Sequence, residues 1–315
     1  MNVSTVTEFI FLGISCSHSI HLLFFLLVLV SYTTIMLGNL LIVVTVNTEP
    51  RLHQSPMYFF LASLSVIDSG LGSVAAPKMM ADLVTCDRTI SFGGCMAQFF
   101  FLHFLGGSEM LLLTLMAYDR YVAICQPLTY TATMNRPRCV RLLVSCWVGG
   151  FVHSAIQLVL ILRLPFCGPN ELDSFYCDVP QVVRLACTNA YVTELLMVAN
   201  SGLLSLVSFL ILMVSYGVII ATLKGHFKER GGKVLSTCSS HLMVVSLIFV
   251  PCLFVYLIPF SSSRVDKMAS VFYTVITPAL NPIIYSLRNH EMKEAMGRLK
   301  NKCIFCHSRV KGEQN

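Results

Sequence analysis

The chain alternates long apolar runs with short polar connections. Each run is longer than the roughly 17 residues that a helix needs to cross about 30 Å of hydrocarbon. The apolar runs fall near Leu22–Val46, Met57–Leu83, Cys95–Met116, Cys139–Ile161, Thr193–Leu223, Leu235–Pro259 and Met268–Leu287. No internal repeat or low-complexity tract is visible between them. The pattern therefore predicts one bundle of seven transmembrane helices within residues 22–287.

Composition places this bundle in a membrane. Hydrophobic residues make up 55% of the 315 residues, and charged residues make up only 12%. A soluble domain typically has about a quarter of its residues charged, so this composition excludes an ordinary soluble fold. The expected fold class is an all-α integral membrane protein.

The basic residues predict the orientation, because Lys and Arg concentrate on the cytoplasmic side. With the N-terminus outside, 16 of the 22 basic residues lie in cytoplasmic segments and 6 lie outside. The net charge of +6 then describes an inner face that attracts anionic lipid, and not a nucleic-acid surface. We expect residues 1–21 to be extracellular, without a cleavable signal peptide, and residues 288–315 to form a cytoplasmic tail with a short amphipathic helix.

Two features on the predicted outer side concern covalent modification. Asn2 begins an Asn-Val-Ser tripeptide, which is an acceptor for N-glycosylation. Cys95, Cys167, Cys177 and Cys187 also lie on this side, where disulfides form. Four cysteines allow three pairings, and their spacing leaves all three open alongside free thiols.

A paired charge ends the third apolar run. The stretch MAYDRYVAIC, residues 116–125, sets Asp119 and Arg120 side by side at the predicted cytoplasmic end. Arg120 could be a positive anchor that extends to the interface, with Asp119 solvated beside it. The alternative is a two-state switch, which needs only a few kcal/mol between its states, the scale of a partly exposed ion pair.

Two carboxylic acids lie deep inside the apolar runs. Asp68 is in the second run and Glu109 in the third, where a charge costs at least about 2.5 kcal/mol. Two carboxylates at one site repel, so they need a shared proton or a bound cation. Asn39 and Asn281 could complete a polar cluster. The sequence is equally compatible with two interpretations: a protonated, hydrogen-bonded packing cluster without an ion, and a sodium site.

The outer halves of the runs predict a mostly apolar pocket for a small amphipathic ligand. His103 could hydrogen bond to the ligand, or be a core histidine satisfied by a carbonyl. Gly106 and Gly107 suit a cavity or close helix packing. The outer half of the third run lacks Asp and Glu, so a cationic amine would find no counter-ion there. The candidate ligand-binding residues are His103, Gly106, Gly107, Asn200, Ser201, Phe249, Cys252, Leu253, Tyr256 and Thr274.

Several motifs together resemble odorant receptors, a branch of the rhodopsin-like G-protein-coupled receptors. Besides MAYDRYVAIC they are GN at 38–39, PMYFFLASLSVID at 56–68, FYCD at 175–178, KVLSTCSSHL at 233–242 and PALNPIIYSLRN at 278–289. The resemblance covers essentially the whole chain. It implies a receptor and not an enzyme. Such a receptor binds small volatile odorants, activates a stimulatory olfactory-type heterotrimeric G protein, raises cyclic AMP, and resides in the plasma membrane of olfactory cilia. A receptor for an endogenous hydrophobic metabolite outside the nose is the alternative.

The resemblance also implies roles for individual residues. The cytoplasmic switch would comprise Asp119, Arg120 and Tyr121, and the rearranging part of the seventh helix would comprise Asn281, Pro282 and Tyr285. Asp68 and Glu109 resemble an acidic pair that can hold a cation, and no other cofactor is expected. The implied disulfides are Cys95–Cys177 and Cys167–Cys187.

The chain departs from the family pattern at two places. Residues 174–178 read SFYCD, without the His-containing metal-binding motif that some odorant receptors carry in the outer loop. Metal-assisted recognition of thiols is therefore not expected. Phe249 stands where many members have Tyr, which removes one hydroxyl from the pocket floor.

Three rival functions are disfavoured by the sequence. A transporter or channel usually shows an internal repeat or paired broken helices, and neither is visible. An intramembrane hydrolase needs a nucleophile and base, or clustered metal ligands, at one depth. Residues 303–307 match the C-x-x-C-H pattern of haem attachment, but they lie in the basic tail, where palmitoylated or free cysteines are expected instead.

Overall fold

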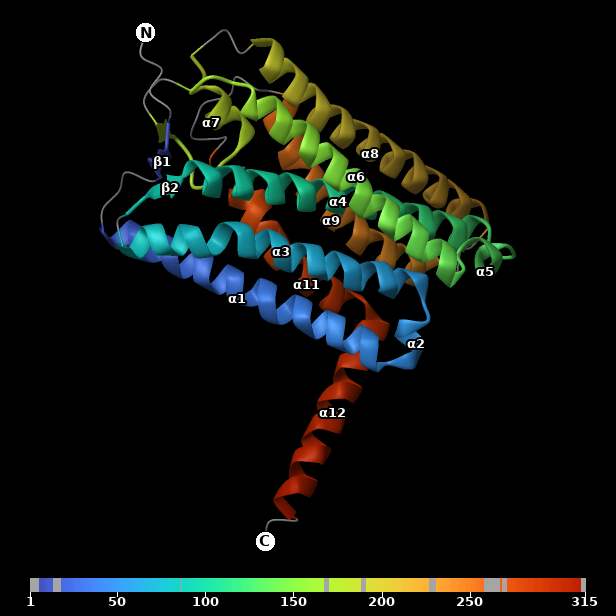
Figure 1. Ribbon diagram of the computed structural model, residues 1–315. Helices are drawn as coiled ribbons and strands as arrows, with labels where there is room; N and C mark the ends of the chain where they lie inside the picture. Colours follow the sequence, from blue (N-terminus) through green and yellow to red (C-terminus); the bar gives the residue numbers. More distant parts are fainter. Residues whose placement is uncertain are drawn as a thin grey trace.

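The chain folds into a bundle of long helices that run alongside one another (Figure 1). The computed structural model describes residues 6–13, 18–85, 87–166, 170–187, 191–226, 231–257, 267 and 271–312. The long helices are α1 (His18–Thr48), α3 (Pro56–Thr85), α4 (Phe92–Cys125), α6 (Arg136–Leu162), α8 (Tyr191–His226) and α9 (Gly231–Leu257), followed by a π-helical turn η1 (Phe272–Ile276) that continues into α11 (Thr277–Arg288).

All seven predicted runs are helical wherever the structure describes them. Within these residues, five helices are long and apolar enough to cross a membrane: Ser19–Thr48, Pro56–Thr85, Phe92–Cys125, Arg136–Leu162 and Tyr191–Thr222. The sixth run contains a shorter apolar helix, His241–Leu253. The seventh begins with the π-helical turn, which hydropathy does not predict.

Short elements close the two ends of the bundle (Figure 1). Helices α2 (Pro50–His53) and α5 (Tyr130–Thr133) lie at the end that we expect to face the cytoplasm. From the same end α12 (His290–Gly312) projects away from the bundle, and it is longer than the short amphipathic helix expected there. Its first turns are held by burial of Met292 and Ala295 and by an ion pair between Arg298 and Glu49.

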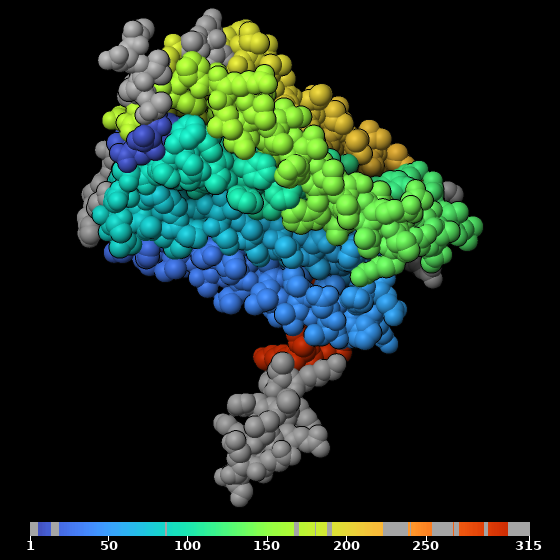
Figure 2. Space-filling model, viewed as in Figure 1, coloured from blue at the N-terminus to red at the C-terminus, as the bar shows by residue number. Residues whose placement is uncertain are grey.

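A small three-stranded sheet caps the opposite end. Strand β1 (Glu8–Phe11) lies between β2 (Thr89–Ser91), which it pairs with in antiparallel fashion, and β3 (Glu171–Leu172), which it pairs with in parallel. Phe9 and Phe11 point inward and are fully buried. Figure 2 shows this dark-blue segment set against the teal start of α4 and the yellow-green outer loop. The predicted glycosylation site, Asn2, lies outside the described residues.

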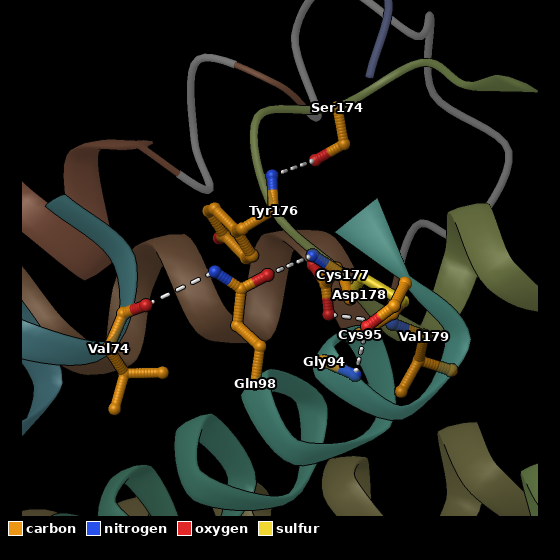
Figure 3. The surroundings of a disulfide bond; sticks show 10 residues. Val74, Gly94, Cys95, Gln98, Ser174, Tyr176, Cys177, Asp178 and Val179 are labelled. Atoms are coloured by element: carbon orange, nitrogen blue, oxygen red, sulfur yellow. Dashed lines mark hydrogen bonds between the residues drawn. A yellow bond between two sulfur atoms is a disulfide. The ribbon is translucent and has the colours of Figure 1, made fainter. Parts of the chain in front are cut away.

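A disulfide ties the long outer loop to the start of α4 (Figure 3). It joins Cys95 to Cys177, one of the pairings that the spacing left open. Beside it the Gln98 Oε1 atom accepts from the Cys177 N–H at 3.0 Å, and Gln98 Nε2 donates to the Val74 carbonyl on α3 at 3.1 Å. The loop is therefore fixed to α4, and the same Gln98 side chain links α4 to α3. Cys187 is also disulfide-bonded, but its expected partner Cys167 lies outside the described residues.

Helices α4 and α6 approach each other closely because Gly150 has no side chain. A Cβ atom at this position would lie 2.1 Å from Ser108 Oγ and 2.7 Å from the Phe104 carbonyl oxygen. The hydroxyl could rotate away, but the carbonyl oxygen belongs to the backbone of α4 and cannot move alone. The contact therefore requires glycine.

We expect Gly150→Ala to push α6 away from α4 and to destabilise the fold by about 1–3 kcal/mol, the usual cost of overpacking. The measurement is the melting temperature of detergent-solubilised protein, followed by fluorescence-detected size exclusion. Gly217→Ala in α8 is the matched control, since its added methyl group meets no described atom within 4 Å. Equal melting temperatures for the two variants would contradict this account of the helix contact.

Candidate functional site

A cavity of about 300 Å³ lies between the helices in the half of the bundle nearer the sheet. This volume includes space open to solvent, and the room inside it for the centre of a water-sized sphere is about 20 Å³. The cavity is lined by residues of α4, α6, α8, α9 and η1: Leu102, His103, Gly106, Gly107, Met110, His153, Ser201, Leu204, Ser205, Cys252 and Tyr273.

His103 presents one ring nitrogen to this cavity. Its Nδ1 atom lies 2.9 Å from the Phe99 carbonyl one helical turn earlier, and its ring stacks on Phe99. Its other nitrogen, Nε2, is buried and has no hydrogen-bond partner among the described residues. His103 is thus partly a core histidine satisfied by a carbonyl and partly a group that can bind a ligand.

His153 is a second histidine of the cavity, on α6. Its ring centroid lies 6.1 Å from that of His103, and a Cβ atom on Gly107 would lie 3.1 Å from its Cδ2 atom. Gly107 therefore makes room for this ring. Asn200 holds His153 from α8, with Nδ2 3.4 Å from the His153 carbonyl oxygen.

The hydroxyl groups on the α8 side are already engaged with neighbours. Ser201 Oγ accepts from Gln157 Nε2 at 2.7 Å, and Ser205 Oγ donates to the Ser201 carbonyl at 2.8 Å. Ser205 Oγ also lies 3.4 Å from Cys252 Sγ. This wall of the cavity is thus polar: Ser205 donates its proton to a neighbour, whereas Ser201 acts only as an acceptor among the described contacts.

The structure brings half of the predicted ligand-binding residues together. His103, Gly106, Gly107, Ser201 and Cys252 line the cavity. Other predicted residues lie beside it: Asn200 supports His153, Phe249 is buried against Phe209, Thr274 donates to the Tyr176 hydroxyl at 2.8 Å, and Leu253 is half-buried. Nothing is described of the Tyr256 side chain.

Six lining residues were not among the predicted set: Leu102, Met110, His153, Leu204, Ser205 and Tyr273. His153 carried a signal, because a histidine inside an apolar run needs a polar partner there. Ser205 lies one helical turn after Ser201 and thus on the same face. The others are ordinary residues of membrane helices, and nothing in the sequence distinguishes them.

The two deep acids meet in the middle of the bundle. The carboxyl groups of Asp68 and Glu109 lie next to each other, and Asn281 Nδ2 donates to Asp68 Oδ2 at 3.0 Å. Four buried oxygens, from Asn39, Asp68, Glu109 and Asn281, have no hydrogen-bond partner in the described part of the chain. Such oxygens are the ligand type that a hard cation prefers. In the same residues no group of three or more His, Cys, Asp or Glu side chains is placed to hold a metal ion.

The other end of α4 carries the paired charge. Arg120 Nη2 lies 3.2 Å from Asp119 Oδ2, and Asp119 is fully buried. The Tyr130 hydroxyl donates to Asp119 Oδ1 at 2.9 Å. Burial and the Asp119 carboxylate raise the pKa of the Tyr130 phenol, so this donor keeps its proton. Asp119 is therefore a buried and doubly bonded acceptor, and not a solvated partner of a surface anchor.

A second cavity, of about 410 Å³, lies at this end, lined by Met57, Leu61, Met116, Arg120, His241, Tyr285 and Asn289. Because its lining includes Arg120 of α4 and Tyr285 of α11, this cavity lies between the paired charge and the seventh helix. The Tyr285 hydroxyl is buried and has no partner among the described residues, whereas the Tyr216 hydroxyl hydrogen bonds to His241. Tyr121 is half-buried, and its hydroxyl oxygen lies 3.5 Å from Gln126 Nε2. Pro282 of the seventh helix packs on Gly38 of α1.

Comparisons with known proteins give one consistent result. The family model described as "Olfactory receptor" matches residues 27–302. The human olfactory receptor 4Q3 is 60% identical over 95% of this chain and 96% of its own length. The human olfactory receptor 4K14 and the mouse olfactory receptor 4E2 are each 54% identical, over 96% of this chain and 98% of their own lengths. The chain therefore belongs to the olfactory receptor family, whose members are seven-helix G-protein-coupled receptors and not enzymes.

Proposed function

We propose that this receptor binds small, mostly apolar or amphipathic volatile molecules in the cavity around His103. Binding stabilises an open inner face and activates a stimulatory olfactory-type G protein, which raises cyclic AMP. The site of action is the plasma membrane of olfactory cilia. The mostly apolar lining of this cavity supports this proposal in a chain of this family, together with one ring nitrogen of His103 and one of His153 that have no partner among the described residues.

The signal has to travel along the bundle. His103 and Arg120 are both on α4, and their separation in sequence corresponds to roughly 25 Å of helix. A ligand at His103 cannot touch Arg120, so the coupling is a rearrangement of helices that both ends share. In the proposed resting state Asp119 holds Arg120. In the active state Arg120 leaves Asp119 and contacts the inserted segment of the G protein.

We also propose a sodium site at the deep acids. Asp68 and Glu109 would hold the ion, with the side-chain oxygens of Asn39 and Asn281 completing its ligands. A bound cation allows both carboxylates to be ionised in a site where they otherwise share a proton. The four unpartnered oxygens of the described residues support this assignment.

Arg120→Ala should abolish odorant-stimulated cyclic AMP while leaving surface expression measurable, because the arginine that engages the G protein is lost. The measurement is cyclic AMP in cells that co-express the receptor and a stimulatory G protein, across a broad odorant panel. An N-terminal tag stained on unpermeabilised cells reports surface expression. Arg138→Ala is the matched control, since Arg138 is an exposed arginine at the same end of the bundle.

Signalling retained by Arg120→Ala would contradict the switch. Silence of the unmutated receptor across the panel, with protein at the surface, would point instead to an endogenous ligand or another G protein.

Sodium should raise the melting temperature of the purified receptor relative to equal ionic strength of N-methylglucamine. At ten times its Kd the ion contributes about 1.4 kcal/mol. Glu109→Gln should remove this response, because it removes one ionised ligand. Asp82→Asn is the control, since Asp82 pairs with Lys78 far from the site and its loss should leave the sodium response intact. An unmutated receptor that does not respond to sodium would support a shared proton instead.

A further inference from the structure

We propose that the cavity selects ligands with a hydroxyl group, an alcohol or a phenol, over the aldehyde, ketone or ether of the same skeleton, because His103 Nε2 accepts the hydroxyl proton. This inference rests on the proposed function and names the ligand class of the same cavity.

The hydrogen bond of His103 to the backbone fixes which nitrogen carries the proton. A carbonyl oxygen can only accept, so the 2.9 Å contact from Nδ1 to the Phe99 carbonyl requires the proton on Nδ1. In a neutral imidazole the other nitrogen is then purely an acceptor. Nε2 is that acceptor, and it is buried in the wall of the cavity.

The surroundings of the ring favour its neutral form. The ring is stacked on Phe99 at a centroid distance of 4.3 Å and faces the ring of His153. No carboxylate of the described residues forms an ion pair with it. A second proton would create a buried cation without a counter-ion and a donor without an acceptor, both of which are costly.

Ser201 of α8 also lines the cavity and can bind the oxygen atom of a ligand hydroxyl group. Ser201 Oγ accepts from Gln157, so its own proton is left to donate, whereas Ser205 already donates to the Ser201 carbonyl. A ligand hydroxyl can therefore donate to His103 Nε2 and accept from Ser201. The oxygen of an aldehyde, ketone or ether can only accept, so it leaves Nε2 unpaired in a closed site.

His153 is a second ring beside this position. Its Nδ1 atom is also buried and has no partner in the described part of the chain. No described contact fixes which of its nitrogens carries the proton, so His153 can donate to a ligand oxygen or accept from it, and the selection of a hydroxyl group rests on His103. The apolar part of the ligand then lies along Leu102, Met110 and Leu204.

The test uses homologous series of straight-chain primary alcohols, the corresponding aldehydes, and methyl ethers of equal length, with phenol, benzaldehyde and anisole as ring compounds. Two readouts are compared: cyclic AMP in cells and the melting temperature of the purified full-length receptor. We expect the best alcohol or phenol to act at a concentration at least about tenfold below its aldehyde and ether, since a site that pairs with a hydroxyl rejects analogues lacking it.

Three variants connect this preference to His103. His103→Phe keeps a flat ring without the acceptor and should bring the ratio of alcohol to ether potency close to one. His103→Gln supplies an amide oxygen as acceptor and should restore part of the ratio. Met110→Leu changes the apolar lining and removes the sulfur that lies 3.4 Å from Ser205 Oγ, but it leaves His103 and Ser201 unchanged, so it should change the preferred chain length and keep the ratio.

The outcomes separate the ligand class from the function. Aldehydes or ethers that equal the alcohols would overturn the hydroxyl inference and leave the receptor function standing. Alcohols that stabilise the purified protein without raising cyclic AMP would support the inference and overturn the proposed coupling. A receptor that no alcohol or phenol activates or stabilises would overturn the inference.

Discussion

The burial of α4 inside the bundle is the constraint on which the rest of the structure depends. Because most of this helix is buried, a polar group on it is costly unless another part of the protein pairs with it. Cys95 and Gln98 bind the outer loop, Glu109 meets Asp68 of α3, and Asp119 holds Arg120 and Tyr130. The features assigned a function thus coincide with the polar side chains of a buried helix and with the groups that pair with them.

The same constraint places the ligand cavity, the acidic pair and the paired charge along one helix. Helix α4 bears His103, Glu109 and Arg120. The acidic pair consists of this Glu109 and of Asp68 on the neighbouring α3. A shift of α4 relative to α3, α6 or α11 changes all three places at once. Gly150 and Gly38 allow neighbouring helices to pack closely, because a side chain at either position would clash with the facing helix. In such close packing, a displacement of one helix forces a displacement of its neighbour.

Hydropathy and charge were sufficient to predict the helices, because a membrane permits little besides apolar helices of a set length. Hydropathy and charge were insufficient to predict local departures from regular helices and the residues at which one helix meets another. The π-helical turn at Phe272–Ile276, the sheet that includes Glu8–Phe11 and the length of α12 have no periodicity that would reveal them. In the cavity, the sequence marked His103 and Gly107 but not His153, because a single helix does not show which of its faces meets another. Thr274 was expected in the pocket and instead bonds to Tyr176, a residue of the outer loop.

The sheet at the outer end can form only late in the synthesis and folding of the chain. Strand β1 is synthesised first, yet its neighbours arrive much later: β2 follows α3, and β3 follows α6, so that the Asn170 side chain reaches Glu8 across 162 residues. Contacts so distant in sequence form late, after the intervening helices have been inserted. Until then Phe9 and Phe11 have nowhere to pack. An unfinished chain therefore exposes two aromatic rings that the finished fold buries, and exposed apolar surface of this kind makes an incomplete chain prone to aggregate.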